Sequence, residues 1–476
     1  MEKSKEYAKN TIILLVGKFA TQFISFFLLP LYTHFLLTDD YGLVDLYQTY
    51  ISLFVPVILL CLDSAVFRFL IDERNDEKKK SQTITNVFLK TIKQIIIFVL
   101  ISSCICFFVD IKYNVFIIFN VIAVMLSNVM LQICRGIGKN LNYSIACIIT
   151  GLITLLTNVI LIIVCKFGAN SILVASSMAN IICSIYILIS TKTYKYIKLK
   201  FKNKEKIKEM LSYSLPLIPN ALSWWIVNAS DRTIISIMIN TTTNGIYTVS
   251  CKFSNLLNSI FSVFSMSWQE TASIHIDDKD RDEFFSKMIN NIYNLFVSVS
   301  VLIIMVASFG FEFIIGKDYI EAYNYIPILL LANTFSVLIG LYGGIYIAKK
   351  MTKRVTTTTI CSAILNLIIN LSLIHWFGLY AACISTLMSY MIMAIYRHID
   401  IRKFIKIEIS TETIIGTIFA FVISFCAYYL RNIVFNIIIF IVIIIYFLYI
   451  NRNILKVIID RIKIKTNNTE NKTQNT

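Results

Sequence analysis

The 476-residue chain is 57% hydrophobic and only 15% charged, and its mean hydropathy is +0.73. Soluble globular proteins carry about 25% charged residues, so this composition excludes a soluble globular chain and predicts a membrane protein. The net charge of +16 does not indicate nucleic-acid binding, because the cations lie between apolar runs and not along a soluble basic groove.

Apolar windows of about 18 to 25 residues, long enough to cross the hydrocarbon core as a helix, recur along the whole chain. The first window lacks a cleavage site and is too long for a signal-peptide core, so we expect it to remain as a helix. The five prolines, Pro30, Pro56, Pro216, Pro219 and Pro327, are predicted to kink the helices that contain them. We place fourteen spans, at 11–37, 41–62, 86–109, 115–133, 143–165, 171–189, 211–239, 246–268, 284–309, 322–348, 357–376, 380–396, 413–430 and 433–450.

The basic residues between the spans indicate the orientation, because cytoplasmic loops carry an excess of Lys and Arg. The even-numbered loops are basic, and the segment 192–208 alone contains eight lysines. The opposite loops carry only Lys112, Lys166, Lys317 and Arg431. We therefore predict a multi-pass membrane protein with both termini in the cytoplasm.

The chain also repeats itself. Tyr41-Gly42-Leu43 matches Asn244-Gly245-Ile246, and Lys166-Phe167-Gly168 matches Trp376-Phe377-Gly378. The pairs are weak singly, and chance similarity among apolar helices is the alternative. Together with equal helix counts they predict an all-α protein of two pseudo-symmetric six-helix bundles, at 1–191 and 209–400. A basic cytoplasmic linker at 192–208 joins the bundles, and 401–476 adds a helix pair and a polar tail.

Polar side chains recur at helical spacing within several spans, and a polar stripe facing lipid would be costly. The predicted eighth span carries Lys252, Asn255, Ser259, Ser262, Met266 and Gln269, and the seventh carries Trp225, Asn228, Arg232 and Ser236. The eleventh span carries Thr358, Ser362, Asn366 and Asn370, and the first carries Lys18, Gln22 and Ser25. We expect these faces to line a water-filled cavity inside the bundle, the alternative being hydrogen bonds that hold helices together.

Charged groups inside the membrane cost about 2.5 to 3.5 kcal/mol each unless paired or hydrated, so they mark candidate sites. A cavity with surplus cation would attract a pyrophosphate, whereas internal ion pairs with nearby acids are the alternative. Asp231 and Arg232 point about 100° apart on a helix, so each should find its partner elsewhere. The candidate cavity residues are Lys18, Trp225, Asn228, Arg232, Lys252, Asn255 and Gln269, followed by Asp63, Arg68, Asn366 and Asn370, with Asp231 and Glu270 as candidate ion-coupling acids.

Signatures of an enzyme or of a cofactor site are missing from the sequence. Gly136-Ile137-Gly138-Lys139 lacks the spacing of a phosphate-binding loop, and the four histidines are scattered. The eleven cysteines lie in apolar runs without a CxxC spacing. We therefore expect no enzymatic activity, no cofactor and no metal.

Three stretches carry a resemblance to a known family. In them the chain resembles the Wzx-type polysaccharide biosynthesis flippases of the multidrug/oligosaccharidyl-lipid/polysaccharide (MOP) exporter superfamily, and the likeness extends over residues 1–400. The stretches are Leu28-Leu29-Pro30-Leu31-Tyr32 with Asp40-Tyr41-Gly42-Leu43, then Tyr213-Ser214-Leu215-Pro216-Leu217-Ile218-Pro219-Asn220 with Ser230-Asp231-Arg232 and Gly245-Ile246-Tyr247, and finally Lys349-Lys350 through Asn366 and Asn370 to Phe377-Gly378-Leu379-Tyr380-Ala381-Ala382 and Ser389-Tyr390.

The resemblance implies a MATE-like fold and a flippase that works by alternating access. Its substrate would be undecaprenyl-pyrophosphate-linked oligosaccharide repeat units for capsule or other surface polysaccharide, held by Arg232, Lys252 and Lys18. Membrane lipids and the glycosyltransferases and polymerase of the same pathway are the implied partners. Fourteen spans exceed the number common among relatives, although the lipid II flippase branch also has two extra helices, so a teichoic-type unit or a peptidoglycan precursor stays open as cargo.

Two other functions remain as alternatives. A cation-coupled drug or solute exporter of the same superfamily would use a buried acid, for which Asp231 is the deep candidate. A membrane polysaccharide polymerase or ligase would need a long outward loop with catalytic residues, and no outward loop here is long.

Overall fold

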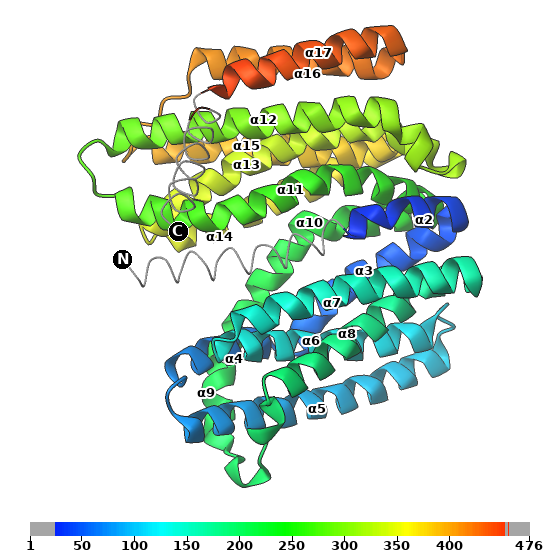
Figure 1. Cartoon of the computed structure of the whole chain (residues 1–476), viewed down its shortest axis with the longest axis vertical. Helices are drawn as coiled ribbons and strands as arrows, with labels where there is room; N and C mark the ends of the chain where they lie inside the picture. The colour runs from blue at the N-terminus through cyan, green and yellow to red at the C-terminus, as the bar shows by residue number, and fades with distance from the viewer. Residues whose placement is uncertain (1–23, 453–455, 457–476) are drawn as a thin grey trace, which may run out of the picture. The chain divides into compact units, whose positions relative to one another are not determined.

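The computed structural model describes residues 24–452 and residue 456, and every long regular element in these ranges is a helix (Figure 1). The chain divides into two compact units. The described part of the first unit comprises 24–249, 315–320 and 370–379, and that of the second comprises 250–314, 321–369, 380–452 and 456. The all-α class is thereby confirmed, whereas the domain boundaries expected from the internal repeat stay a prediction.

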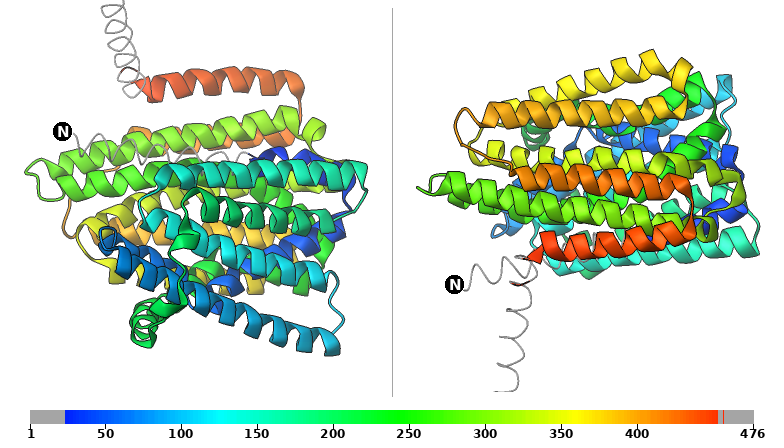
Figure 2. Two further views of the ribbon diagram at one scale, coloured as in Figure 1. Left: turned by 60° about the horizontal axis from the view of Figure 1, so that its bottom comes forward. Right: turned by 90° about the horizontal axis from the view of Figure 1, so that it is seen from above.

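The first unit is built from long helices that lie side by side (Figures 1 and 2). Helix α8 packs against α6 and α7, α4 packs against α6, and α3 packs against α10. The helices are α2 (Leu29–Phe35), α3 (Thr38–Ile58), α4 (Leu62–Asp72), α5 (Glu77–Phe108), α6 (Asn114–Gly136), α7 (Asn140–Val159), α8 (Asn170–Ser190), α9 (Lys204–Ser214), α10 (Ile218–Met238) and the first turns of α11 (Thr241–His275).

The second unit contains the remainder of α11 and six further helices. Helix α12 is its centre, because it packs against α13, α16 and α17. The last turns of α14 belong to the first unit, so α11 and α14 each pass from one unit into the other. The helices are α12 (Arg281–Ile314), α13 (Ile326–Ala348), α14 (Thr352–Phe377), α15 (Leu379–Ile401), α16 (Thr411–Leu430) and α17 (Ile433–Ile450).

Side-chain caps determine where several helices begin. Asp76 accepts hydrogen bonds from the backbone N–H groups of Lys78 and Lys79 at the start of α5, and Ser410 caps α16 in the same manner. Such caps satisfy N–H groups that have no partner inside the helix. The cap at Asp76 starts α5 within a charged segment, about two helical turns before the apolar run predicted at 86–109.

Ten helices in the described part of the chain are long and apolar enough to cross a membrane, and the bent pair α3 and α4 makes up to eleven. Helices α10 and α11 occupy the predicted seventh and eighth spans but fall outside this set, because polar and charged side chains lower their hydropathy. The first predicted span begins among residues outside the described ones. A multi-pass membrane protein is confirmed, and the count of fourteen stays a prediction.

Four of the five prolines lie where one helical segment gives way to the next. Pro30, Pro219 and Pro327 occupy the first turns of α2, α10 and α13, where the missing N–H leaves no hydrogen bond unmade. Pro216 lies in the short 3₁₀ segment before α10. Only Pro56 lies inside a helix, close to the 53° bend between α3 and α4. Helical segments also precede Pro30, Pro219 and Pro327, at 24–27, Leu215–Leu217 and Lys317–Tyr325, so a kink at these three positions stays a prediction.

Two glycines bring α3 and α11 into close contact within the first unit. A Cβ atom on Gly42 would overlap the carbonyl oxygen of Thr241, and one on Gly245 would overlap the carbonyl oxygen of Thr38. The side-chain amide of Asn244 donates to the Gly42 carbonyl at 2.8 Å. Gly42 and Gly245 are the residues that the internal repeat aligns with each other, and they pack together here. This contact sets the spacing of the helices that carry the polar cluster described below.

The lysine-rich segment between α8 and α9 is bound to α5. Thr85 Oγ1 donates to the Tyr196 carbonyl at 2.9 Å, and the Asn86 amide donates to the Phe201 carbonyl at 3.0 Å. Lys206 Nζ lies 2.8 Å from Glu73 Oε1, and both side chains are mostly buried. The segment is therefore an ordered part of the first unit.

Candidate functional site

A cluster of charged and polar side chains lies inside the first unit, where α3, α10, α11 and α14 contribute to it. At its centre, Arg232 Nε lies 2.7 Å from Asp45 Oδ2, with the side chains 17% and 10% exposed. We call Asp45, Asp231, Arg232, Tyr247, Thr248 and Asn370 the Arg232 cluster. Its ion pair joins α3 to α10, so the charge of Arg232 is compensated inside the protein.

The carboxylate of Asp45 has a second partner. Thr248 Oγ1 donates to Asp45 Oδ2 at 2.7 Å, and Thr248 is fully buried on α11. Asp45 therefore connects three helices, through one hydrogen bond from α11 and one ion pair with α10. A buried carboxylate needs such donors because burial removes its hydration. Asp45 was not singled out in the sequence, because it lies on α3 among apolar residues and its partners come from distant helices.

Asp231 occupies a separate polar environment from its sequence neighbour Arg232. Its Oδ1 accepts a hydrogen bond from the Asn370 amide at 2.7 Å, and its Oδ2 accepts one from the Tyr247 hydroxyl at 3.2 Å. Asp231 is 7% exposed and Asn370 is fully buried. As expected from their angular offset, the two residues have different partners. The structure thus brings together two candidate site residues, Asp231 and Asn370, that lie far apart in the sequence.

Trp225 contributes packing and one hydrogen bond near this cluster. Its indole Nε1 donates to the Thr49 carbonyl at 2.9 Å, and its ring stacks against Tyr50 at a centroid distance of 6.3 Å. These contacts tie α10 to α3. Lys18 and the side chain of Asn228, both expected in the cavity, lie outside the described part of the structure.

The polar stripe of α11 lies in the second unit, and its side chains are half-buried or exposed. Lys252, Ser259, Ser262 and Gln269 are half-buried, and Asn255 and Glu270 are exposed. Ser259 and Ser262 donate to carbonyls of their own helix at 2.8 Å. The opposite face of α11 is buried through Phe253, Leu257, Phe261 and Trp268. Helix α11 is therefore amphipathic, and its polar face is only partly covered by the described part of the protein.

The polar stripe of α14 differs from the expected cavity lining. Asn366 donates to Ser385 Oγ and Thr386 Oγ1 at 3.4 Å, and Ser362 donates to the Ser389 carbonyl at 3.3 Å. These partners belong to α15, and Asn366 is 2% exposed. Hydrogen bonds of this kind hold neighbouring helices together in a membrane. Asn366 therefore holds α14 to α15, which was the alternative to lining a water-filled cavity.

Arg68 and Asp63 also lie apart from the Arg232 cluster. Arg68 Nη1 is 2.7 Å from Asp72 Oδ1, one turn later on α4, and the two side chains are 50% and 64% exposed. This is a surface ion pair of small energetic value. Asp63 is half-buried in the first turn of α4, where a negative charge is favourable.

Sequence reasoning missed Arg397, which it assigned to a cytoplasmic loop. Helix α15 continues to Ile401, so Arg397 lies inside it and is 2% exposed. Its guanidinium donates to Thr358 Oγ1 at 2.7 and 3.0 Å, to the Ile339 carbonyl at 2.9 Å and to the Val355 carbonyl at 3.2 Å. The run of four threonines that begins at Thr356 supplies hydroxyl acceptors and is the signal that could have indicated a buried donor. Within the described residues, no three His, Cys, Asp or Glu side chains are grouped to hold a metal ion.

Comparison with known proteins adds a family and a fold. A sequence model of the family described as polysaccharide biosynthesis protein matches residues 7–269, more than half of the chain. A stretch of 61 residues is 36% identical to the Lsg locus putative protein 1 of Haemophilus influenzae. That stretch is 13% of this chain and spans only 15% of the relative's length.

Solved structures of transporters are similar over nearly the whole chain. The lipid II flippase MurJ in an inward closed conformation matches with a TM-score of 0.67 and 15% identity, covering 93% of this chain and 100% of that chain. An inward-facing multidrug resistance MATE family transporter matches with a TM-score of 0.65 and 13% identity, covering 83% and 94%. A MOP superfamily transporter from Pyrococcus furiosus matches with a TM-score of 0.56 and 14% identity, covering 83% and 95%. At such identities the similarity shows the MOP-superfamily fold, as the sequence led us to expect.

Proposed function

This chain belongs to the polysaccharide biosynthesis protein family, and we propose that it moves undecaprenyl-pyrophosphate-linked oligosaccharide repeat units from the cytoplasmic to the outer leaflet of a bacterial cell membrane. The product would be used for capsule or another surface polysaccharide. Family membership and a fold shared with a lipid II flippase support this cargo class. Lipid-linked oligosaccharide, membrane lipids and the enzymes that build and polymerise the repeat unit are the proposed partners.

The observation that carries the proposal is the ion pair of Arg232 and Asp45 within the helices of the first unit. Ionised groups at membrane depth are costly, and they are kept where a translocated charge needs them. A pyrophosphate can replace a carboxylate as the partner of an arginine, because both accept two parallel N–H bonds. We propose that the carrier phosphate displaces Asp45 from Arg232 during transport. Lys252 and the polar face of α11 would then contact the sugar units as they cross the membrane.

The test is export of surface polysaccharide in a strain whose own copy is replaced by variants. Arg232→Gln is expected to abolish export, and Arg232→Lys to retain part of it, because lysine keeps the charge but loses the bidentate geometry. The double variant Asp45→Asn with Arg232→Gln removes both charges, so it tests whether the pair serves folding alone. It should be present in the membrane at normal level and still fail to export.

Arg68→Gln is the matched control, because it removes an arginine from a surface ion pair and should leave export unchanged. Normal export by the double variant would mean that the Arg232 pair has only a structural role. Accumulation of lipid-linked repeat units on the cytoplasmic side in the Arg232→Gln strain would place the defect at translocation and not at synthesis.

Asp231 favours a second candidate function, cation-coupled export. The carboxylate is buried and accepts hydrogen bonds from the neutral groups of Asn370 and Tyr247, a setting in which a proton or a sodium ion can bind an acid. A strain that lacks the protein would then become more sensitive to drugs while its surface polysaccharide stays normal. The opposite result, lost polysaccharide with unchanged drug sensitivity, would exclude this candidate.

A further inference from the structure

A pocket of about 650 Å³ lies in the second unit, between the start of α14 and the end of α15. Small-molecule sites commonly measure about 300 to 1,000 Å³. Its charged lining consists of Lys350, Lys353, Arg354, Lys403 and Asp400. The lining contains four cations and one carboxylate, a surplus of three positive charges. This surplus favours an anion that carries more charge than a single phosphodiester.

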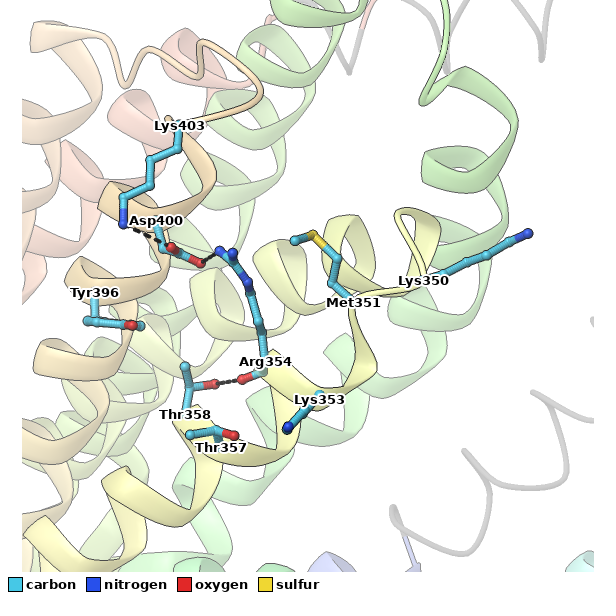
Figure 3. Close-up of a pocket in the computed structure, with 9 residues that line it drawn as sticks. All are labelled: Lys350, Met351, Lys353, Arg354, Thr357, Thr358, Tyr396, Asp400 and Lys403. Atoms are coloured by element: carbon cyan, nitrogen blue, oxygen red, sulfur yellow. Dashed lines mark hydrogen bonds and ion pairs between the residues drawn. The ribbon is translucent and has the colours of Figure 1, made fainter.

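Asp400 organises part of this charge. Arg354 and Lys403 converge on its carboxylate in Figure 3, and Lys403 Nζ lies 3.3 Å from Asp400 Oδ1. The Tyr346 hydroxyl also donates to Asp400, at 2.9 Å, and holds the acid in place from α13. Arg354 is therefore oriented before a ligand arrives, which lowers the entropic cost of binding.

Lys350 and Lys353 are exposed at the rim of the pocket, and Lys350 extends away from Asp400 in Figure 3. Among the residues that the structure describes, no acidic side chain lies within ion-pair distance of either lysine. Lys350 also has a left-handed backbone, with φ of 59°, at the end of α13. Glycine adopts this left-handed conformation with less strain than lysine. A lysine therefore stands here despite a conformational cost, and it adds a positive charge to the rim of the pocket.

An apolar groove continues from the pocket along α14 and α15. Its volume is about 230 Å³, and Thr357, Thr358 and Tyr396 line both the pocket and the groove. Farther along, the groove is lined by Leu365, Ile392 and Met393. A ligand that fits both parts has a multiply charged anionic head and a hydrocarbon chain.

We infer that this pocket and groove form a loading site for the prenyl diphosphate end of the lipid carrier, an inference that rests on the proposed function. The basic loop at Lys349 to Arg354 is on the side that the charge distribution predicts to be cytoplasmic, where the carrier receives its sugars. The diphosphate binds Arg354 and the rim lysines, and the first isoprene units lie in the groove. The site is distinct from the Arg232 cluster, which belongs to the first unit.

Binding of farnesyl diphosphate to the purified full-length protein in detergent tests the headgroup part. The variant Lys350→Gly with Lys353→Gln is expected to bind about fivefold more weakly for each lysine removed, the effect of a lysine beside lipid phosphate. Lys350→Gly also relieves the left-handed strain, so a misfolded variant is not expected. Lys192→Gly is the matched control, because Lys192 is an exposed lysine with φ of 55° after α8 and lies outside the pocket.

The groove part is tested with Ile392→Trp, which should fill the groove and weaken farnesyl diphosphate binding while leaving inorganic pyrophosphate binding unchanged. Ile395→Trp is its control, since Ile395 is exposed on the same helix but does not line the groove. Wild-type affinity in both the lysine and the Ile392 variants would overturn the proposal. If inorganic pyrophosphate bound as tightly as farnesyl diphosphate, the site would be one for the free anion. If phosphatidylglycerol competed as well as farnesyl diphosphate, the site would be one for ordinary phospholipid. Either result would also overturn the proposal.

These results are separable from the proposed function. Unchanged farnesyl diphosphate binding in the pocket variants, together with export that depends on Arg232, would refute this site alone. Normal surface polysaccharide in a strain that lacks the protein would refute the proposed function, whatever the binding measurement shows.

Discussion

Two buried arginines have their charges compensated in different ways. Arg232 faces the carboxylate of Asp45, whereas Arg397 donates to the hydroxyl of Thr358 and to backbone carbonyls. No acidic side chain of the described chain lies within ion-pair distance of Arg397. Its charge is stabilised by these hydroxyl and carbonyl dipoles and by the Tyr346 ring, whose centroid lies 5.8 Å from Arg397 Cζ. Neither set of partners could be read from the sequence, because both sets come from helices that are distant in the chain.

The first prediction concerns Thr358, which accepts two hydrogen bonds from Arg397. Thr358→Val keeps the shape of the side chain but removes the acceptor, and a hydrogen bond to a charged group contributes about 1.5 to 3 kcal/mol. We expect a lower midpoint of thermal unfolding in detergent. Thr357→Val is the control, because Thr357 is exposed. Equal shifts in the two variants would mean that the hydroxyl of Thr358 does not stabilise Arg397.

Helix contacts decide which polar stripes are covered by a neighbouring helix. Periodicity identified the stripes of α11 and α14 equally well, yet the α11 stripe is only partly covered and the α14 stripe bonds to α15 through Asn366 and Ser362. In both stripes, polar residues recur every three or four positions along one helix. The difference lies in which helix packs beside them, and the pattern along one helix contains no information on its neighbours.

The second prediction concerns the contact of α3 with α11. In a solvated helix, replacing glycine by alanine normally stabilises by up to about 1 kcal/mol. Gly245→Ala should instead lower the unfolding midpoint, because its Cβ would overlap the Thr38 backbone, which has little freedom to move. Gly310→Ala on α12 is the control, since only the end of the Ile314 side chain comes near, at 3.4 Å. A stabilised Gly245→Ala protein would contradict the close contact.

At the scale of the whole molecule, the distribution of Lys and Arg among the loops predicts how the chain is oriented in the membrane. The four cations on the predicted outward side include Lys112 and Lys166, and the predicted inward segments include the eight lysines of 192–208. The excess of positive charge on one side arises because basic loops resist translocation during insertion. The same argument puts the loading pocket at Lys350 on the cytoplasmic side.

The third prediction uses alkaline phosphatase fusions in a Gram-negative host. The reporter is active only where disulfides form, outside the cytoplasm. We expect activity for fusions after Lys112, Lys166 and Asn240, and none after Lys200 or Lys279. The Asn240 fusion lies between α10 and α11, so its activity also tests whether these two polar helices cross the membrane. An inactive Asn240 fusion would reduce the count of fourteen by two.

The all-helical membrane class and the family followed from the sequence alone, because apolar length and short motifs are properties of consecutive residues. The sequence also identified Arg232, Asp231 and Asn370 as candidates. Only the tertiary structure decided that Asp45 pairs with Arg232, that Asn366 holds α14 to α15 and that Arg397 is buried. The physical reason is that a side chain's charge compensation and hydration depend on atoms from other helices, and which helices pack together is decided by the whole chain at once.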